Sequence, residues 1–133
     1  MTEAAAHMAI EFRLKGNFSK TRKHLSRLTR LSLEHKLKPY AEKGVYELAK
    51  NTPIDTGATA RSWDYRIVSD KDGITIKFIN NNAPYGVPVA IMIQNGHATR
   101  GGTYVQGIDY INPALRPVFE DIASMIQREV EHN

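Results

Sequence analysis

The residues best suited to chemistry are five histidines and one Asp-Thr-Gly sequence. His24 and His35 stand about three helical turns apart, which is too far to share a metal ion within one chain. His97 lies in a polar, glycine-rich stretch with Thr99 and Arg100, and a lone histidine in a loop is more often a hydrogen-bonding residue than a catalyst. The chain has no cysteine, which excludes disulfides, thiolate zinc sites and cysteine nucleophiles. We expect no metal and no cofactor.

The Asp-Thr-Gly sequence occurs once, at Asp55-Thr56-Gly57. It is similar to the active-site turn of aspartic proteases, in which two carboxylates share one proton. A chain with a single copy would supply one of these carboxylates, and a homodimer would supply both. In those enzymes the turn follows an apolar strand, whereas here it follows a helical pattern and Pro53. We therefore interpret Asp55 as a turn-closing residue and Gly57 as a left-handed glycine, and keep a homodimeric protease as an alternative.

Other catalytic motifs are missing from the sequence. It contains no phosphate-binding glycine loop, no dinucleotide fingerprint and no nucleophile elbow around a serine. The longest apolar run, residues 87–93, is far shorter than the ~20 residues of a membrane span. We predict a protein that is not an enzyme and has no membrane partner.

Basic residues are concentrated in the first part of the chain. The net charge is +4, but residues 1–50 hold 11 Lys or Arg against 5 Asp or Glu, and residues 51–133 hold 7 against 9. A basic half attracts polyanions, most often nucleic acid, although a solvated helix face also carries lysines. Interleaved aromatic residues, which mark single-strand binding, are missing from this stretch. One alternative is therefore a small, basic protein that binds nucleic acid without regard to sequence.

The hydrophobic patterns predict an α+β protein. Alternation predicts a strand over residues 8–15 and a hairpin whose two strands begin at Trp63 and Ile74. A pattern without turn residues predicts a helix over residues 20–51. The second half of the chain favours a short helix over residues 88–94, with a buried strand as the alternative. A polar loop over 97–102 and a last strand over 104–110, interrupted at Gly107, are predicted to follow.

The last helix is predicted to start with Asn112 as its N-cap and Pro113 as its first residue. Its apolar residues repeat at helical spacing to the C-terminus, and Pro117 is expected to distort or delay its first turn. The whole is a single domain, residues 1–133. It consists of a small, mostly antiparallel sheet packed by a long kinked N-terminal helix and a C-terminal helix.

The long helix has an apolar face that changes sides. In its first half one face holds Leu25 and Leu28, and the opposite face holds a basic stripe of Lys20, Lys23, Arg27 and Arg30. Beyond Pro39 the apolar residues are Ala41, Val45 and Leu48. In a straight helix they would lie on the side that carries the basic stripe in the first half, and not on the side of the leucines. Because proline removes a backbone hydrogen bond, we predict a kink or break near Leu37–Pro39. The two halves would then pack on different things, one of them a neighbouring subunit.

Three segments are familiar in their order and spacing. The first is Thr52-Pro53-Ile54-Asp55-Thr56-Gly57 followed by Ala60-Arg61-Ser62-Trp63, the second ends in Gln94-Asn95-Gly96-His97, and the third is Asn112-Pro113-Ala114-Leu115. Together they resemble the minor tail-component family of long-tailed bacteriophages and prophages, over about residues 18–130. The chain departs from the family in its second segment, where Glu commonly precedes the glycine and Gln94-Asn95 stand here.

The resemblance implies a structural virion protein of the neck or tail-completion type. Such proteins are expected to form a ring, a hexamer on the six-fold axis where head meets tail, around the channel through which double-stranded DNA leaves. Its partners would be copies of itself, the adjacent head-completion or stopper protein, and a tail-terminator or tail-tube protein. The protein would be assembled in the cytoplasm of the bacterial host and remain in the virion, and a tail terminator that caps the tube is the alternative role.

Two groups of residues follow from the ring hypothesis. The basic stripe of Lys20, Lys23, Arg27 and Arg30 is predicted to face the DNA, mostly through sequence-independent phosphate contacts. Contacts between subunits or between rings are predicted at the residues of the first two familiar segments and the loop that follows them: Asp55, Thr56, Gly57, Arg61, Trp63, Gly96, His97 and Arg100.

Overall fold

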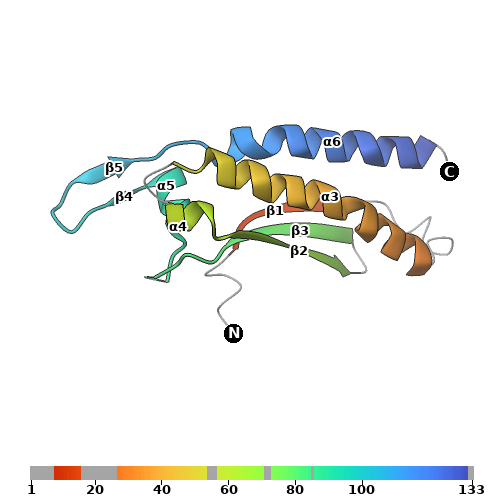
Figure 1. Cartoon of the computed structure of the whole chain (residues 1–133), viewed down its shortest axis with the longest axis horizontal. Coiled ribbons are helices and arrows are strands. Elements are labelled where there is room, and N and C mark those ends of the chain that lie inside the picture. Colours follow the sequence, from red (N-terminus) through yellow and green to blue (C-terminus); the bar gives the residue numbers. More distant parts are fainter. Residues whose placement is uncertain (1–7, 16–26, 54–56, 71–72, 85, 132–133) are drawn as a thin grey trace.

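The chain folds as an α+β protein, as predicted. The computed structural model describes residues 8–15, 27–53, 57–70, 73–84 and 86–131, and for 8–15, 27–31, 70 and 129–131 it describes the backbone alone. Figure 1 shows the arrangement of its helices and strands. Along the chain they are β1 (Met8–Lys15), α3 (Arg27–Asn51), α4 (Gly57–Ala60), β2 (Trp63–Asp70), β3 (Gly73–Asn80), α5 (Val89–Asn95), β4 (Gly96–Ala98), β5 (Tyr104–Gln106) and α6 (Ile111–Glu131).

The main sheet has three antiparallel strands in the order β1-β3-β2. The predicted hairpin of β2 and β3 is confirmed, and the first strand pairs with the free side of β3. β3 is therefore the central strand, and its side chains are buried on both faces apart from the half-buried Lys77.

The core lies between this sheet and two long helices. α3 and α6 run side by side over one face of the sheet (Figure 1). Phe78, at the centre of β3, is fully buried and lies against Phe119 of α6, with ring centroids 6.4 Å apart. Gly44 of α3 makes this close packing possible, because a Cβ there would lie 2.6 Å from the Phe78 ring. The other fully buried large apolar side chains come from α3, β3 and α6: Leu37, Leu48, Ile76, Leu115, Val118 and Ile122.

Of the kink or break predicted near Leu37–Pro39, a break is not found, because α3 continues through Pro39 without interruption. Pro39 and His35, whose carbonyl would lose its hydrogen bond, are both exposed, so water can satisfy that carbonyl. Leu37 and Ala41 are buried on either side of the proline, and this packing holds both halves in one helix. The predicted apolar face of the second half is thus confirmed, while residues 18–26 of the first half lie outside the described residues.

The last helix starts earlier than predicted. α6 begins at Ile111 and continues through Pro117, which lies exposed on its surface, so neither the delay nor Asn112 as the N-cap is correct. Its buried face is confirmed by Leu115, Val118 and Ile122. The short helix favoured before Gly96 is also confirmed as α5. None of the helices within the described residues is both long and apolar enough to cross a membrane.

Candidate interaction surface

A two-stranded ribbon projects from one end of the molecule. β4 and β5 pair only with each other, with His97 opposite Val105, and extend away from the rest of the fold (Figure 1, left). The turn between them is closed by the Thr99 N–H, which donates to the Thr103 carbonyl at 2.8 Å. We call residues 96–108 the arm. The predictions of a polar loop over 97–102 and of a strand over 104–110 are each right in part, because strand occupies only 96–98 and 104–106.

Two glycines shape the base of the arm, where its strands lie close to α5. Gly96 has a left-handed backbone (φ 83°), and a Cβ there would lie 2.5 Å from the Tyr104 hydroxyl oxygen. A Cβ on Gly107 would lie 2.5 Å from the Gln94 carbonyl oxygen. Beyond this crossing the Ile108 N–H donates to the Ile93 carbonyl at 2.9 Å. The arm therefore leaves the body along a fixed path.

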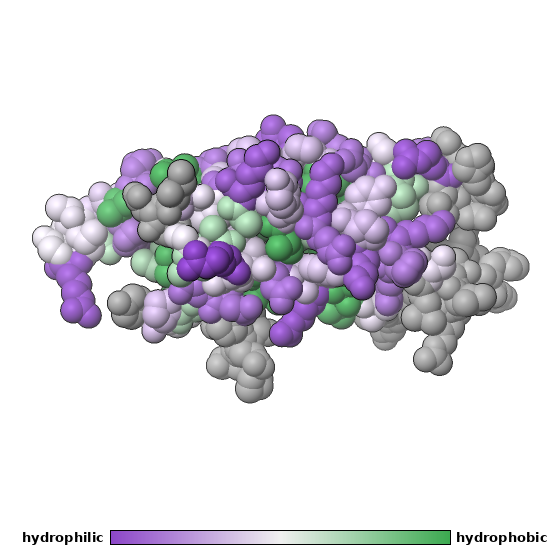
Figure 2. Space-filling model, viewed as in Figure 1, coloured by the Kyte–Doolittle hydropathy of each residue, from purple (hydrophilic) through white to green (hydrophobic). Residues whose placement is uncertain are grey.

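The arm exposes large apolar side chains that nothing in the described chain covers. Tyr104, Val105 and Ile108 are 64%, 45% and 54% exposed. In Figure 2 the arm at the left is mainly pale to green, whereas much of the surface beside it is purple. An isolated two-stranded ribbon is marginally stable in water and gains stability when another surface packs on it. The arm thus has the properties of a binding element.

Gln94, at the end of α5, ties the arm's base to α6. Its side-chain oxygen accepts hydrogen bonds from the backbone N–H groups of Tyr110 and Ile111, both at 3.0 Å. These are free donors at the start of α6, so Gln94 acts as a cap from a distant part of the sequence. Its amide nitrogen donates to Asp109 at 2.7 Å. The glutamine thus makes its contacts within its own chain.

The same hydrogen bonds lower the pKa of Asp109. The bond from Gln94 is the largest effect and holds the pKa of the Asp109 carboxyl below its ordinary value; desolvation opposes it as the second-largest effect, and Asn112 and Arg116 add smaller lowering effects. The Asn112 amide donates to the same carboxylate oxygen at 3.1 Å. Asn112, predicted as the N-cap of this helix, instead donates from its side chain to the Asp109 carboxylate.

A buried polar network fixes α3, β2, α5 and α6 to one another at this end. The Trp63 indole N–H donates to the Thr52 hydroxyl at 2.9 Å, and that hydroxyl donates to the Leu48 carbonyl at 2.6 Å. The Tyr110 hydroxyl donates to the Ala90 carbonyl at 2.8 Å. Burial raises the pKa of Tyr110 to about 12, against a smaller opposite effect of the Thr52 hydroxyl.

A second buried group holds the short helix α4. Asn80, at the end of β3, is fully buried and donates from its side chain to the Thr59 carbonyl at 2.9 Å. Asn82 donates to the Thr59 hydroxyl at 2.8 Å. The segment after the Asp-Thr-Gly sequence is therefore fixed to the sheet by amide side chains.

The first group of predicted contact residues has mixed positions. Asp55 and Thr56 lie outside the described residues. Gly57 starts α4 and does not have the left-handed backbone predicted for it. Arg61 is exposed, whereas Trp63 is only 6% exposed and belongs to the core, because its strand turns this side chain towards the helices. Trp63 is thus a structural residue and has little surface for a neighbouring subunit.

The second group lies in the arm. Gly96 forms its base, Arg100 is exposed at its turn, and His97 is half-buried in β4. The Nδ1 atom of His97 is buried without a hydrogen-bond partner among the described residues. Tyr104, Val105 and Ile108, the exposed apolar residues of the arm, were predicted as residues of a last strand and not as a contact surface. The one signal in the sequence was their position just after Gly101-Gly102.

The side chains of the predicted DNA-facing stripe lie outside the part of the chain that the structure describes. Lys20 and Lys23 lie outside the described residues, and Arg27 and Arg30 lie in the first turn of α3 with only their backbone described. Among the described residues, no three His, Asp or Glu side chains come together as a metal site.

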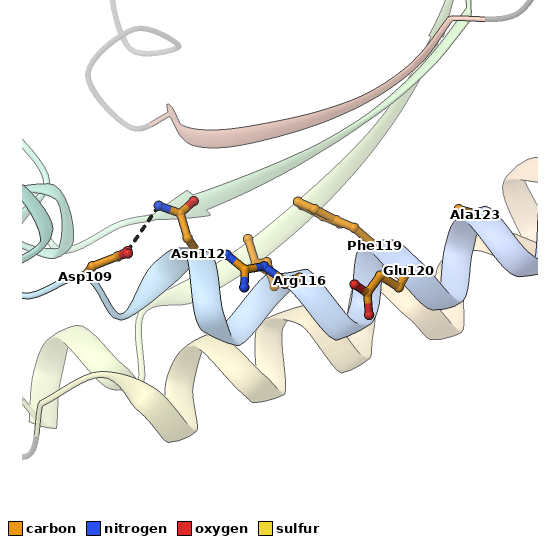
Figure 3. A pocket seen from close by; sticks show the side chains of 7 residues that line it. Asp109, Asn112, Arg116, Phe119, Glu120 and Ala123 are labelled. Carbon is orange, nitrogen blue, oxygen red and sulfur yellow. Dashed lines mark hydrogen bonds between the residues drawn. The ribbon is translucent and has the colours of Figure 1, made fainter.

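A shallow groove of about 430 Å³ runs along α6 from the base of the arm, on the side where Phe119 and Asn112 point toward the strands (Figure 3). Leu115 and Phe119 give it an apolar floor, and charged side chains stand at its edges. Its lining residues are Asp109, Asn112, Leu115, Arg116, Phe119, Glu120 and Ala123.

Comparisons of the chain with models of protein families, with curated proteins and with solved structures find no match.

Proposed function

We propose that this chain is a structural subunit that assembles with copies of itself into a ring at the head–tail joint of a long-tailed bacteriophage or prophage. The observation that carries the proposal is the projecting arm with its exposed Tyr104, Val105 and Ile108. Apolar side chains gathered on a projecting ribbon are characteristic of a surface that another molecule covers. A ring of copies supplies that cover at every position.

The asymmetry of the molecule favours a ring over a simple pair. Among the described residues the ribbon of β4 and β5 projects at one end, and the other helices and strands pack together in the body (Figure 1). When an arm binds a different surface of the next copy, the contact is head-to-tail and repeats until the ring closes. The resemblance to minor tail components adds the place of this ring, its six-fold symmetry and the DNA channel at its centre.

The position of the three familiar segments is consistent with this assignment. The Thr52 hydroxyl of the first segment acts on the Tyr110 side chain and lowers its pKa, and Gln94 of the second segment bonds to the backbone at the start of α6, where the third lies. The three segments therefore gather at the end of the molecule from which the arm projects. In the proposed ring this end contacts the neighbouring subunit or the adjacent head-completion, tail-terminator or tail-tube protein. The basic stripe from Lys20 to Arg30 faces the DNA.

The test is electron microscopy of particles made by the phage or prophage after deletion of this gene. We expect filled heads beside complete, separate tails, with joined virions restored by the wild-type gene. Restoration should fail with Tyr104→Ser/Ile108→Ser and succeed with Tyr46→Ser, since Tyr46 on α3 is 63% exposed and Tyr104 is 64% exposed. Normal joined virions after deletion would contradict the proposal. Overlong tail tubes would change the role to tail terminator.

A further inference from the structure

The chain contains an arm with exposed apolar side chains and a groove along α6 that is partly apolar. Tyr104, Val105 and Ile108 are exposed on the arm, and the half-buried Phe119 gives the groove apolar surface, whereas Leu115, which also lines it, is already buried (Figure 3). Each has the surface character that the other needs, because apolar groups gain stability when they leave water together.

The arm and the groove also match in length. Five residue steps separate Gly96 from Gly101, which at the rise of a strand is about 17 Å. Eleven steps separate Asn112 from Ala123, which at the rise of a helix is also about 17 Å. A complete arm therefore fits the complete groove.

Charges fix the direction in which an arm lies in the groove. Arg100 is exposed at the tip of the arm and pairs with no described residue. Near one end of the groove Asp109 is already bonded to Gln94 and Asn112, and Arg116 would repel a second arginine. Near the other end Glu120 is exposed, and it forms no ion pair with a described side chain. Arg100 therefore meets Glu120, with the tip of the arm at Ala123.

The arm that fills the groove comes from another copy. The arm leaves its own body at the start of α6 and extends in the direction opposite to that helix (Figure 1), so it does not lie along its own groove. We propose that the arm of one copy docks in the α6 groove of the next, with Arg100 beside Glu120. This inference rests on the proposed ring and identifies the contact that builds it.

The absence of cysteine from the sequence allows a direct test by cross-linking. One full-length chain carries Gly101→Cys, where an added Cβ meets only the Thr99 hydroxyl at 3.9 Å. A second chain, of distinguishable mass, carries Ala123→Cys in the groove. The two are mixed and oxidised, and the disulfide-linked species are identified by mass spectrometry. The matched control is Ser124→Cys, which is also exposed on α6 but does not line the groove.

The expected product is a mixed 101–123 pair, several-fold more abundant than the 101–124 pair. Arg100→Glu on the first chain should reduce this product several-fold, and Glu120→Arg on the second chain should restore it. A predominance of 101–101 or 123–123 pairs, or equal yields with the control, would overturn the docking geometry.

The outcome separates this inference from the proposed function. Rings without the 101–123 product reject the docking and leave the ring intact as a proposal. Rings are scored by electron microscopy of the same unoxidised samples. Chains that stay monomeric at the highest soluble concentration and form no product overturn the docking, and normal virions after gene deletion overturn the proposed function itself.

Discussion

The body and the arm of this molecule treat apolar side chains in opposite ways. In the body, Phe78 and Leu115 are at most 1% exposed between the sheet and the two long helices. In the arm, Tyr104 and Ile108 are more than half exposed on a ribbon of two short strands. Burial of one large apolar side chain stabilises a fold by about 1.5–3 kcal/mol, so the body holds the stability of the chain. The arm keeps its apolar surface for association.

Changes to the body should therefore unfold the protein. Phe78→Ala removes the ring that lies against Gly44 and Phe119, and we expect a loss of about 3–5 kcal/mol in the free energy of unfolding. Urea denaturation followed by far-ultraviolet circular dichroism measures it. A loss below about 1 kcal/mol would mean that the site refills easily, contrary to the close packing described here.

High pH should weaken the connection between body and arm. Tyr110 has a pKa of about 12 in the folded chain against 10.0 ordinarily, so its contribution is complete below pH 10 and is lost as the pH rises towards 12. The two-unit difference corresponds to about 2–3 kcal/mol at most. Unfolding free energies measured between about pH 9 and pH 11.5 should show this decline. Tyr110→Phe should lose most of it, whereas Tyr104→Phe, which changes an exposed residue, should keep it.

The long-range cap should have a smaller effect. Gln94→Ala leaves the N–H groups of Tyr110 and Ile111 without their acceptor, and we expect a loss of about 1 kcal/mol in unfolding free energy. The unfolding free energy of the variant should also fall less than that of the wild type as the pH is lowered. The lowered pKa of Asp109 adds stability above its ordinary value of 3.8 that is lost as the pH falls, and Gln94 is the main cause of that lowering. Unchanged stability at both neutral and acidic pH would show that water replaces the cap.

Changes to the arm should have the smallest effect on folding. Tyr104→Ser/Ile108→Ser removes side chains that are already exposed, so the unfolding free energy of dilute, monomeric protein should change by less than about 0.5 kcal/mol. Chemical denaturation at low protein concentration measures it. A loss similar to that of Phe78→Ala would make the arm part of the core and remove the contrast on which the proposal depends.

Local patterns in the sequence predict much of the body. The helical spacing of Leu115, Val118 and Ile122 predicts the buried face of α6, and alternation predicts the β2–β3 hairpin. The position of β3 at the centre of the sheet could not be predicted in this way, because strand order depends on contacts far apart in the sequence. The continuity of α3 through Pro39 could not be predicted for the same reason. The packing of Leu37 and Ala41 outweighs one missing hydrogen bond, and that packing depends on the whole fold.

The arm end was harder to predict than the body. The alternation from Tyr104 onwards predicts a strand, but nothing in it shows that the strand leaves the body with its apolar side chains uncovered. The role of Gln94 as a helix cap also depends on a fold that brings α5 to the start of α6. Trp63 was predicted at an interface because of its neighbouring motif, whereas its hydrogen bond to Thr52 lies inside the core.

The central claim is that the arm serves assembly and the body serves stability. Its most direct test is the mass of the full-length protein in solution, measured by light scattering after size exclusion for the wild type, Tyr46→Ser and Tyr104→Ser/Ile108→Ser. We predict one closed ring for the first two and a monomer for the third, with equal unfolding free energies for all three dilute proteins. The same mass for all three would contradict the claim.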